Sequence, residues 1–452
     1  MTPGIVVRKT VPMRYTAAIL ISFLLFTGCA GRNVYSVLNR SLQAGDCRGA
    51  IALINGSRED YGSNAALLYL LDSAMVNMQC GTFSLAQERL HAAEALAEKL
   101  WTASISRNVA AMVTNDYVLP YAGEDYERVM IHLISAIGYL RMEQLDEALV
   151  EIRRLDSLLK IFEADYKEDD VYKTDAFGRY LSGMLHEADA AYDDAYIDYY
   201  RAAGNYLNQW RRYGTDLPDI LAQDLLRVAT AVNRLDDVKN VLPASTLARW
   251  EQFGSESSTG KVVLVVFSGE GPHKIQDMVT IPSPHGPLSI AFPRIVSGAV
   301  FCRGGNLQLV GKNGSLAGEL VVVSDINRIA LTSLNDRKGR IVAKAVARAV
   351  AKQVAIQTIA STGESSEQKQ TMAIILNMAN MLMLEKADTR SWRTLPGRIQ
   401  AARVMVAPGE YKARLVLCRN QVFDLGTITV APGGTRFRFV DTRYGGRQAT
   451  KP

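Results

Sequence analysis

The chain has 452 residues, with 51 Lys and Arg against 46 Asp and Glu, and a formal net charge of +5. Its five cysteines and five histidines lack the close spacing of a zinc site, which argues against a bound metal. The near-neutral total hides a split: residues 31–259 hold 22 basic and 34 acidic residues, whereas residues 260–452 hold 26 and 12. Two halves of opposite charge predict two domains, for which the chain is long enough.

The first 28 residues have the layout of a secretory signal. They begin with three basic residues and no acid, continue with an apolar run at 17–26, and end in small residues. The run is shorter than the about 20 apolar residues that cross a bilayer. We therefore expect residues 1–28 to be removed and the mature chain to begin at Cys29.

The end of this segment, Phe26-Thr27-Gly28-Cys29, resembles the lipobox of bacterial lipoproteins, with Phe26 in the usual place of Leu. The resemblance implies a diacylglyceryl group on the thiol of Cys29 and an acyl chain on its amino group, which together form a stable anchor. Ala30 after the cysteine implies sorting to the outer membrane, facing the periplasm. The alternative is an ordinary secretory signal with an incidental Cys29. The expected compartment excludes nucleic acid as a partner, and the only expected prosthetic group is this lipid.

The four other thiols are Cys47, Cys80, Cys302 and Cys418. An oxidising compartment permits disulfides. Cys47 and Cys80 fall near the turns of adjacent predicted helix pairs, and their bridge would add about 3–4 kcal/mol. Cys302 and Cys418 lie in predicted strands and can pair only if those strands are neighbours. Buried free thiols are the alternative for each pair.

Residues 29–250 predict a helical domain. Apolar residues recur at intervals of three and four, most clearly between 133 and 158. A turn signature recurs as well: a polar or Gly turn, a bulky residue, and a small or apolar residue three positions on. It occurs at 45–50, 81–86, 143–148, 190–195 and 233–238. This pattern is typical of the corners of tetratricopeptide-like helix pairs, with a non-repeating helical bundle as the alternative.

A Ser/Gly-rich linker at 251–260 separates this part from a mixed α/β domain at 261–452. Helices are expected at 334–361 and 372–387, the second very apolar, and three or four antiparallel strands close the chain. Further strands are expected at 261–267, 287–295, 298–303, 306–310 and 319–323. We therefore predict an α+β protein in which a helical array precedes a mixed domain.

Three longer segments carry a family resemblance: "YAGEDYERVMIHLISAIGYL" (121–140), "VVFSGEGPHK" (265–274) and "ADTRSWRTLPGRIQAARVMVAPGEY" (387–411). Together they resemble a poorly characterised family of bacterial outer-membrane lipoproteins with tetratricopeptide-like helices in front of a mixed α/β domain. Members are often encoded near lipoproteins that activate cell-wall synthases. The resemblance implies architecture, location and an envelope setting, and it assigns no chemistry.

The candidates for catalysis are few. Glu270 and His273, with Asp277 nearby, could supply acid/base chemistry if they lined a cleft. The favoured interpretation is a tight strand exit, because no nucleophile or metal partner lies close in sequence. His91, His132 and His186 fall in helical patterns, where core or surface histidines with internal partners are the commoner outcome.

Two features suggest binding. Tyr126 and Arg128 open a helix expected on the inner face of the array, where they would hold a peptide or simply start the helix. A basic stripe at helical spacing suggests contact with anionic lipid or glycan, or docking on the acidic half, with a solvated helix face as the alternative. The stripe comprises Arg337, Arg340, Lys344, Arg348 and Lys352.

These observations favour a non-enzymatic, membrane-tethered scaffold or adaptor for envelope proteins, including those of cell-wall synthesis, with partners bound on the concave face of the array. Two alternatives remain open. One is a cell-wall-active hydrolase using Glu270 and His273. The other is a structural component of an export or appendage complex.

Overall fold

The computed structural model describes residues 30–107, 117, 119–165, 172, 174–250, 260–282, 288–300, 302, 304–361, 366 and 386–443. The lipidation site Cys29 and most of the predicted apolar helix 372–387 lie outside these residues. Within the described part, no helix is both long enough and apolar enough to cross a membrane.

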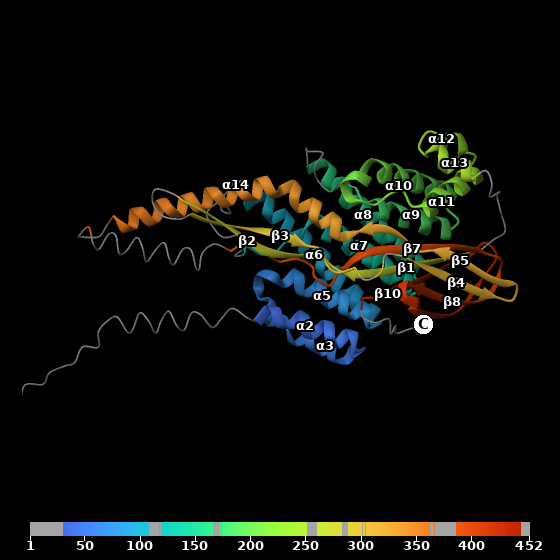
Figure 1. Ribbon diagram of the computed structural model, residues 1–452, viewed down its shortest axis with the longest axis horizontal. Coiled ribbons are helices and arrows are strands. Elements are labelled where there is room, and N and C mark those ends of the chain that lie inside the picture. Colours follow the sequence, from blue (N-terminus) through green and yellow to red (C-terminus); the bar gives the residue numbers. More distant parts are fainter. Residues whose placement is uncertain are drawn as a thin grey trace, which may run out of the picture.

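The N-terminal half is built from antiparallel helix pairs, shown in blue to green in Figure 1. The pairs are α2 (Ala30–Gln43) with α3 (Cys47–Gly56), α5 (Ala66–Gln79) with α6 (Phe83–Arg107), α7 (Asp125–Arg141) with α8 (Leu145–Asp165), α9 (Ala176–Ala188) with α10 (Tyr192–Tyr213), and α11 (Asp219–Ala231) with α12 (Leu235–Lys239). Three short elements complete this half: α4 (Arg58–Tyr61), η1 (Ser63–Ala65) and α13 (Ala244–Trp250).

Every predicted corner lies between the two helices of a pair, and all five corners share one geometry. The first residue of each signature has a left-handed backbone: Gly45, Gly81, Glu143, Ala190 and Asn233. The small or apolar residue that ends each signature is 0% exposed: Ala50, Ala86, Ala148, Ala195 and Val238. A small side chain at this point lets the paired helices approach closely, which confirms the prediction of a tetratricopeptide-like array.

The C-terminal half contains ten strands and one long helix among the described residues. Sheet A has the strand order β10-β1-β7-β6, sheet C has the order β5-β4-β8-β9, and β2 and β3 form a two-stranded sheet. The strands are β1 (Gly260–Glu270), β2 (His273–Ile281), β3 (Leu288–Val296), β4 (Gly305–Gly311), β5 (Gly314–Glu319), β6 (Val321–Asp325), β7 (Pro396–Val406), β8 (Gly409–Leu417), β9 (Val422–Val430) and β10 (Thr435–Asp441).

Three details differ from the sequence-based expectations. Residues 298–300 and 302 are not in a strand. The helix expected at 334–361 is α14 (Ile326–Ala360), which begins eight residues earlier, directly after β6. The last strand, β10, pairs parallel with β1 and not in a hairpin with β9. The pairing of β10 with β1 depends on contacts between distant parts of the chain, which local patterns do not encode. The earlier start of α14 is local, because the side chain of Asp325 accepts a hydrogen bond from the backbone N–H of Arg328.

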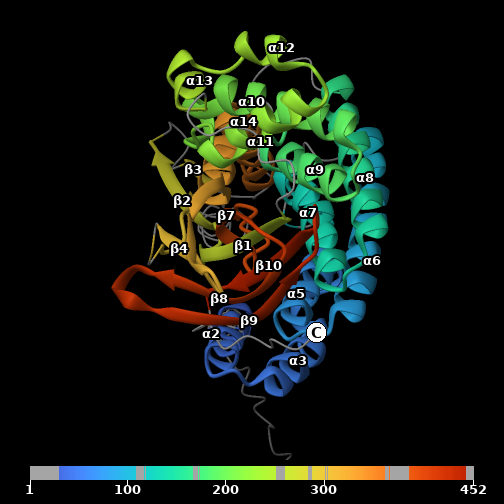
Figure 2. The same ribbon diagram turned by 90° about the vertical axis from the view of Figure 1, so that its right-hand side faces the viewer.

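Sheet A is the middle layer of the molecule. Alternate residues of β1 point to opposite faces, as in any strand. Val263 and Val265 join the core formed by the helical array, whereas Val262 and Leu264 join a second core against sheet C. Figure 2 shows the inner helices α5, α7 and α9 lying between the strands and the outer helices α6 and α8.

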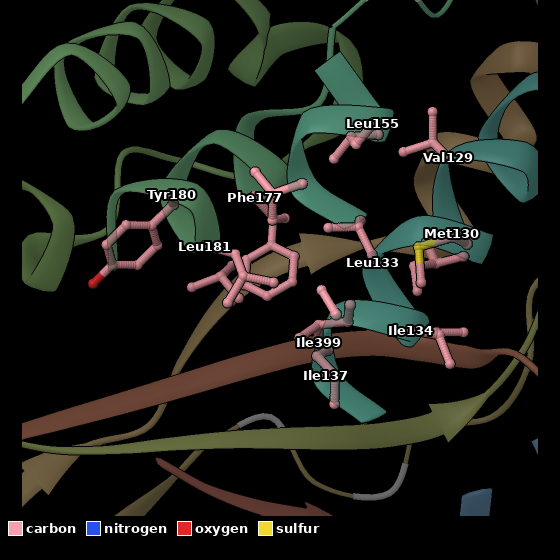
Figure 3. Packing of buried hydrophobic residues seen from close by; sticks show 14 of the residues in the cluster. Val129, Met130, Leu133, Ile134, Ile137, Leu155, Phe177, Tyr180, Leu181 and Ile399 are labelled. Atoms are coloured by element: carbon pink, nitrogen blue, oxygen red, sulfur yellow. The ribbon is translucent and has the colours of Figure 1, made fainter. Parts of the chain in front are cut away.

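The core between the array and sheet A is continuous. Figure 3 shows apolar side chains of α7 packed beside those of α8 and α9, with Ile399 of β7 next to Ile137. The concave face of the array is therefore filled by the chain's own sheet.

Candidate functional site

The inner helices present buried acids to the C-terminal half. They are Asp72 on α5, Glu124 at the start of α7, Glu187 on α9 and Asp224 on α11, none more than 9% exposed. An acid buried without a partner is costly, so each needs hydrogen bonds or a cation. All four find such a partner in the C-terminal half.

The partners come from several elements of that half. Thr394 donates a hydrogen bond of 2.6 Å to Asp72. The other three acids form ion pairs: Glu124 with Lys274 and Arg337, Glu187 with Lys261, and Asp224 with Arg403. Charges of opposite sign in the two halves are thus paired along their boundary, which we call the seam.

Glu127 lies at the centre of the seam and is 0% exposed. Its carboxylate accepts hydrogen bonds from the backbone N–H of Trp392 at 2.7 Å and from the hydroxyl of Tyr121 at 2.5 Å. Burial, and next the neighbouring carboxylate of Glu124, raise the pKa of Glu127 to about 7. Burial also acts to raise the pKa of Glu124, but Arg337 and Lys274 outweigh it and hold that pKa well below its ordinary value.

Tyr126 and Arg128 lie in the first turn of the inner helix α7, as the helix-start alternative expects. Tyr126 is 3% and Arg128 7% exposed. The guanidinium of Arg128 lies over the ring of Trp101, 4.5 Å from its centroid, and also contacts Phe162. Both side chains make their contacts within this chain. They do not face an open concave surface, because sheet A and residues 386–395 occupy the inner face of the array.

The basic stripe on α14 is not a uniform solvated face. Arg337 pairs with Glu124, and Arg348 is buried. Arg340 is exposed and Lys344 is half-buried, while the side chain of Lys352 lies outside the described part of the structure. The first residue of the stripe therefore docks on the acidic half, one of the alternatives that the sequence left open.

The proposed catalytic residues do not form a constellation among the described residues. Glu270 is exposed at the end of β1, and no hydrogen bond there joins it to His273. Burial, and next Arg393, lower the pKa of His273. Asp277 pairs with Arg294 across the β2–β3 hairpin at 2.9 Å. The turn at 270–273 thus serves as a strand connection.

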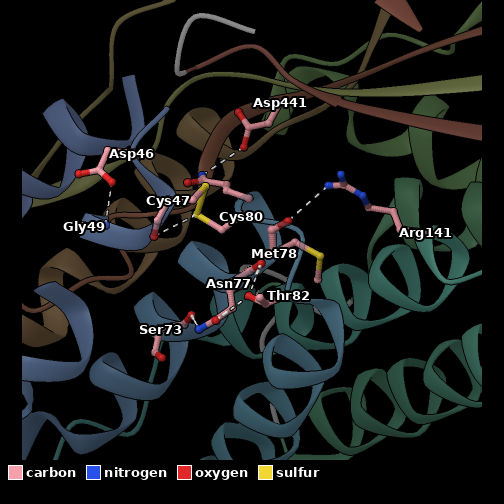
Figure 4. Close-up of a disulfide and its surroundings, with 11 residues drawn as sticks. Asp46, Cys47, Gly49, Ser73, Asn77, Met78, Cys80, Thr82, Arg141 and Asp441 are labelled. Carbon is pink, nitrogen blue, oxygen red and sulfur yellow. Dashed lines mark hydrogen bonds between the residues drawn. A yellow bond between two sulfur atoms is a disulfide. The ribbon is translucent and has the colours of Figure 1, made fainter. Parts of the chain in front are cut away.

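The structure joins the four thiols in two disulfides. Cys47–Cys80 ties α3 to the end of α5, with the Cα atoms 5.4 Å apart (Figure 4). Cys302–Cys418 ties the segment before β4 to the end of β8, with a Cα separation of 5.8 Å. Both bridges link segments that are already neighbours in the fold.

An open hollow lies on the outer face of the array, between α10 and α12. The helical repeat of α10 turns Ala195 and Tyr199 into the core and leaves Tyr196 and Tyr200 half-buried at its edge. Their rings lie 5.9 Å apart, and the hydroxyl of Tyr196 is 3.4 Å from Asp237 on α12. The hollow has a volume of about 290 Å³ and is lined by Tyr196, Ile197, Tyr200, Arg201, Asp237 and Asn240.

Several large side chains of α10 near this hollow are exposed. Tyr192 and Ile197 are each 42% exposed, and Trp210 further along α10 is 45% exposed. Exposed aromatic residues beside a hollow with a few polar groups are typical of a binding surface. The sequence holds a signal for this surface: Tyr192, Tyr196 and Tyr200 recur every four residues, which places them on one face of a helix.

The fold defines a class of protein: a tetratricopeptide-like helical array whose inner face is filled by a strand-rich C-terminal half. No family model matches the chain, and no curated protein matches its sequence. Solved structures with TPR-like repeats resemble its helical half.

One is a kinesin light chain of Podosopora anserina with nearly identical TPR-like repeats, at 13% identity, covering 49% of this chain and 94% of that one, with a TM-score of 0.32. MamA AMB-1 shares 13% identity over 50% of this chain and 94% of that one, with a TM-score of 0.28. BtubC (BKLC) from P. vanneervenii shares 14% identity over 54% of this chain and 87% of that one, with a TM-score of 0.33.

Proposed function

We propose that the chain is a lipid-anchored scaffold of the bacterial envelope that binds a segment of a partner protein in the hollow between α10 and α12. The observation that carries the proposal is the half-buried pair Tyr196 and Tyr200, which line the hollow beside Arg201 and Asp237. An apolar or proline side chain of the partner would fit against the two rings. Arg201 and Asp237 would fix its backbone by hydrogen bonds.

The anchor part of the proposal depends on the sequence Phe26-Thr27-Gly28-Cys29. Confinement to a membrane raises the effective concentration of a scaffold for partners in the same membrane, so a modest affinity in the hollow is sufficient. Cys29→Ser should abolish labelling with radioactive palmitate and release the chain from the membrane fraction. Unchanged labelling in that variant would contradict the anchor.

The binding surface is tested by placing a photo-crosslinking amino acid at Ile197 in cells. The control carries it at Val422, which is 57% exposed on β9, far from the hollow in the fold. We expect a reproducible envelope protein to be captured from position 197 and not from 422. Identical capture from the two positions would refute a specific surface at the hollow.

Substitutions test the same surface without a probe in it. Tyr196→Ala combined with Tyr200→Ala should lower capture by a full-length, lipidated chain at least tenfold, because both rings are lost from the hollow. Ile161→Ala on α8 is the matched control, since Ile161 is 48% exposed outside the hollow. Because Tyr196 and Tyr200 pack partly against the core, the double variant should lower the urea midpoint, but both variants should still unfold in one cooperative transition. Full capture by the double variant would overturn the proposal.

A further inference from the structure

A second cluster of chemically active side chains lies on the other side of the array, where three helices meet. His91 and Glu94 come from α6, His132 from α7 and Glu151 from α8. His132 and Glu151 are buried, Glu94 is partly buried and the side chain of His91 is 42% exposed. The hollow and the seam use none of these residues.

The donor atoms of this cluster converge. Oxygen atoms of Glu94 and Glu151 and a ring nitrogen of His132 all lie within 4.8 Å of one another. Nε2 of His132 is 3.8 Å from Oε1 of Glu94, and Nε2 of His91 is 3.4 Å from Oε1 of Glu151. Ligands about 2.0–2.2 Å from a tetrahedral zinc ion lie about 3.3–3.6 Å from each other. One of these separations is already that of a tetrahedral site, and the other needs only a small movement.

The remaining nitrogen of His132 is also placed for metal binding. Nδ1 lies 3.0 Å from Oε2 of Glu151. A ligating histidine usually donates its second N–H to a carboxylate, which fixes the ring and makes the ligating nitrogen more basic. Here Glu151 would orient His132 through Oε2 while offering Oε1 to the ion.

A cation already lies among these acids. The guanidinium of Arg154 is 3.1 Å from Glu94 and 3.3 Å from Glu151. Its side chain is 46% exposed, so it can turn into solvent when another cation binds. The acids carry two negative charges, which match one divalent ion when both imidazoles are neutral.

We propose that Glu94, His132 and Glu151 form a binding site for a divalent transition metal, with Zn²⁺ a good fit to one imidazole and two carboxylate ligands. His91, which contacts Glu151 and the hydroxyl of Tyr139, would turn toward the ion as the fourth ligand. Its role is structural: the ion joins the helix pair α5–α6 to the pair α7–α8. In the absence of metal, the guanidinium of Arg154 forms ion pairs with Glu94 and Glu151. It is independent of the hollow and of the proposed partner.

The test uses the full mature chain with both disulfides intact, without a polyhistidine tag, after treatment with a chelator. Calorimetric titration with Zn²⁺ should give one equivalent, and Co²⁺ should give the visible absorption of a tetrahedral site. His132→Ala and Glu94→Gln should each weaken Zn²⁺ binding at least about tenfold. Glu94 is partly exposed, so its variant tests the site even if His132→Ala does not fold.

Two further variants separate metal binding from a purely structural ion-pair network. His186→Ala is the matched control, because His186 makes the same 3.0 Å contact with Asp198 outside the cluster. It should bind Zn²⁺ as the wild type does. Arg154→Gln should bind Zn²⁺ at least about threefold more tightly, since the competing cation is gone. Absence of stoichiometric binding in the wild type, full binding by Glu94→Gln, or weaker binding by Arg154→Gln would overturn the site.

Discussion

Two glutamates one helical turn apart should respond in opposite ways to the same substitution. Glu124 and Glu127 are both buried in the seam, but only Glu124 has cations in contact, Lys274 and Arg337. Glu127 is surrounded by hydrogen-bond donors, and burial beside Glu124 raises its pKa from 4.5 to about 7. Its site therefore favours a neutral side chain.

The expected change in the free energy of unfolding for Glu127→Gln follows from the difference between the pKa of Glu127 in the folded and in the unfolded state. A carboxyl group whose pKa is raised in the folded state contributes to stability. This contribution has its full size at pH values below the pKa of the group in the unfolded chain, 4.5. That contribution is lost as the pH rises through the folded value of about 7. At about 1.4 kcal/mol per pKa unit, this loss is about 3 kcal/mol. Glutamine has the shape of the neutral carboxyl and does not titrate. We therefore expect Glu127→Gln to be close to the wild type at pH 4.5 and more stable by up to about 3 kcal/mol at pH 8.

Glu124→Gln is the control, because it should change the stability of the protein in the opposite direction. The pKa of Glu124 is lowered in the folded state, so its contribution is present above its unfolded value of 4.5 and is lost as the pH falls toward its folded value. Glutamine would leave Lys274 and Arg337 without their buried partner. Breaking a buried pair in this way costs about 3–5 kcal/mol at neutral pH.

The assay is urea unfolding of the three proteins at pH 4.5, 6 and 8, followed by tryptophan fluorescence and far-ultraviolet circular dichroism. A change in midpoint at constant slope reports stability. If Glu127→Gln destabilises the protein at pH 8, the hydrogen bonds from Trp392 and Tyr121 outweigh the cost of burying the charge. The reasoning about the seam would then be wrong.

Four further variants test packing and cross-linking. A Cβ at Gly183 would lie 2.4 Å from the ring of Tyr199, so Gly183→Ala should lower the free energy of unfolding by about 1–3 kcal/mol. Gly204→Ala, where no atom lies within 4 Å, should raise it by up to about 1 kcal/mol, and equal thermal midpoints for the two variants would contradict this account. Replacing Cys47 and Cys80 by serine opens a link across 33 residues and should cost about 3–4 kcal/mol, with faster proteolysis of α2 and α3 as the measurement. Trp392 is 0% exposed, so Trp392→Ala should cost about 3–5 kcal/mol in urea unfolding, and a loss below 1 kcal/mol would show that it does not anchor the seam.

The helical half could be predicted because its signals are local. A left-handed turn residue and a small or apolar residue three positions beyond the bulky one lie within six residues of each other at every corner. At Gly45 and Gly81 the turn residue is the one that adopts this backbone at least cost. Glu143 and Ala190 adopt it as well, so the prediction there depended on the spacing and not on the residue type.

The sites were harder to predict because their residues come from distant elements. His91, His132 and Glu151 belong to three helices, and their spacing in sequence does not resemble a metal motif. Their convergence follows only from the stacking of one helix pair on the next. The peptide-binding alternative for Tyr126 and Arg128 supposes an open inner face, for a related reason. The array alone would expose that face, and the sequence of α7 does not show that sheet A covers it.

The filled inner face decides where a partner can bind. Opening the seam would separate Lys261 from Glu187 and Arg403 from Asp224, and it would expose the apolar face of sheet A at the same time. Removing one partner from a buried ion pair costs about 3–5 kcal/mol, and several such pairs would break together. A peptide that entered the inner face would have to replace all of these contacts. The hollow between α10 and α12 requires no such opening, because it lies at the surface and its Tyr196 and Tyr200 are already partly exposed. Binding there is therefore compatible with a seam that stays closed.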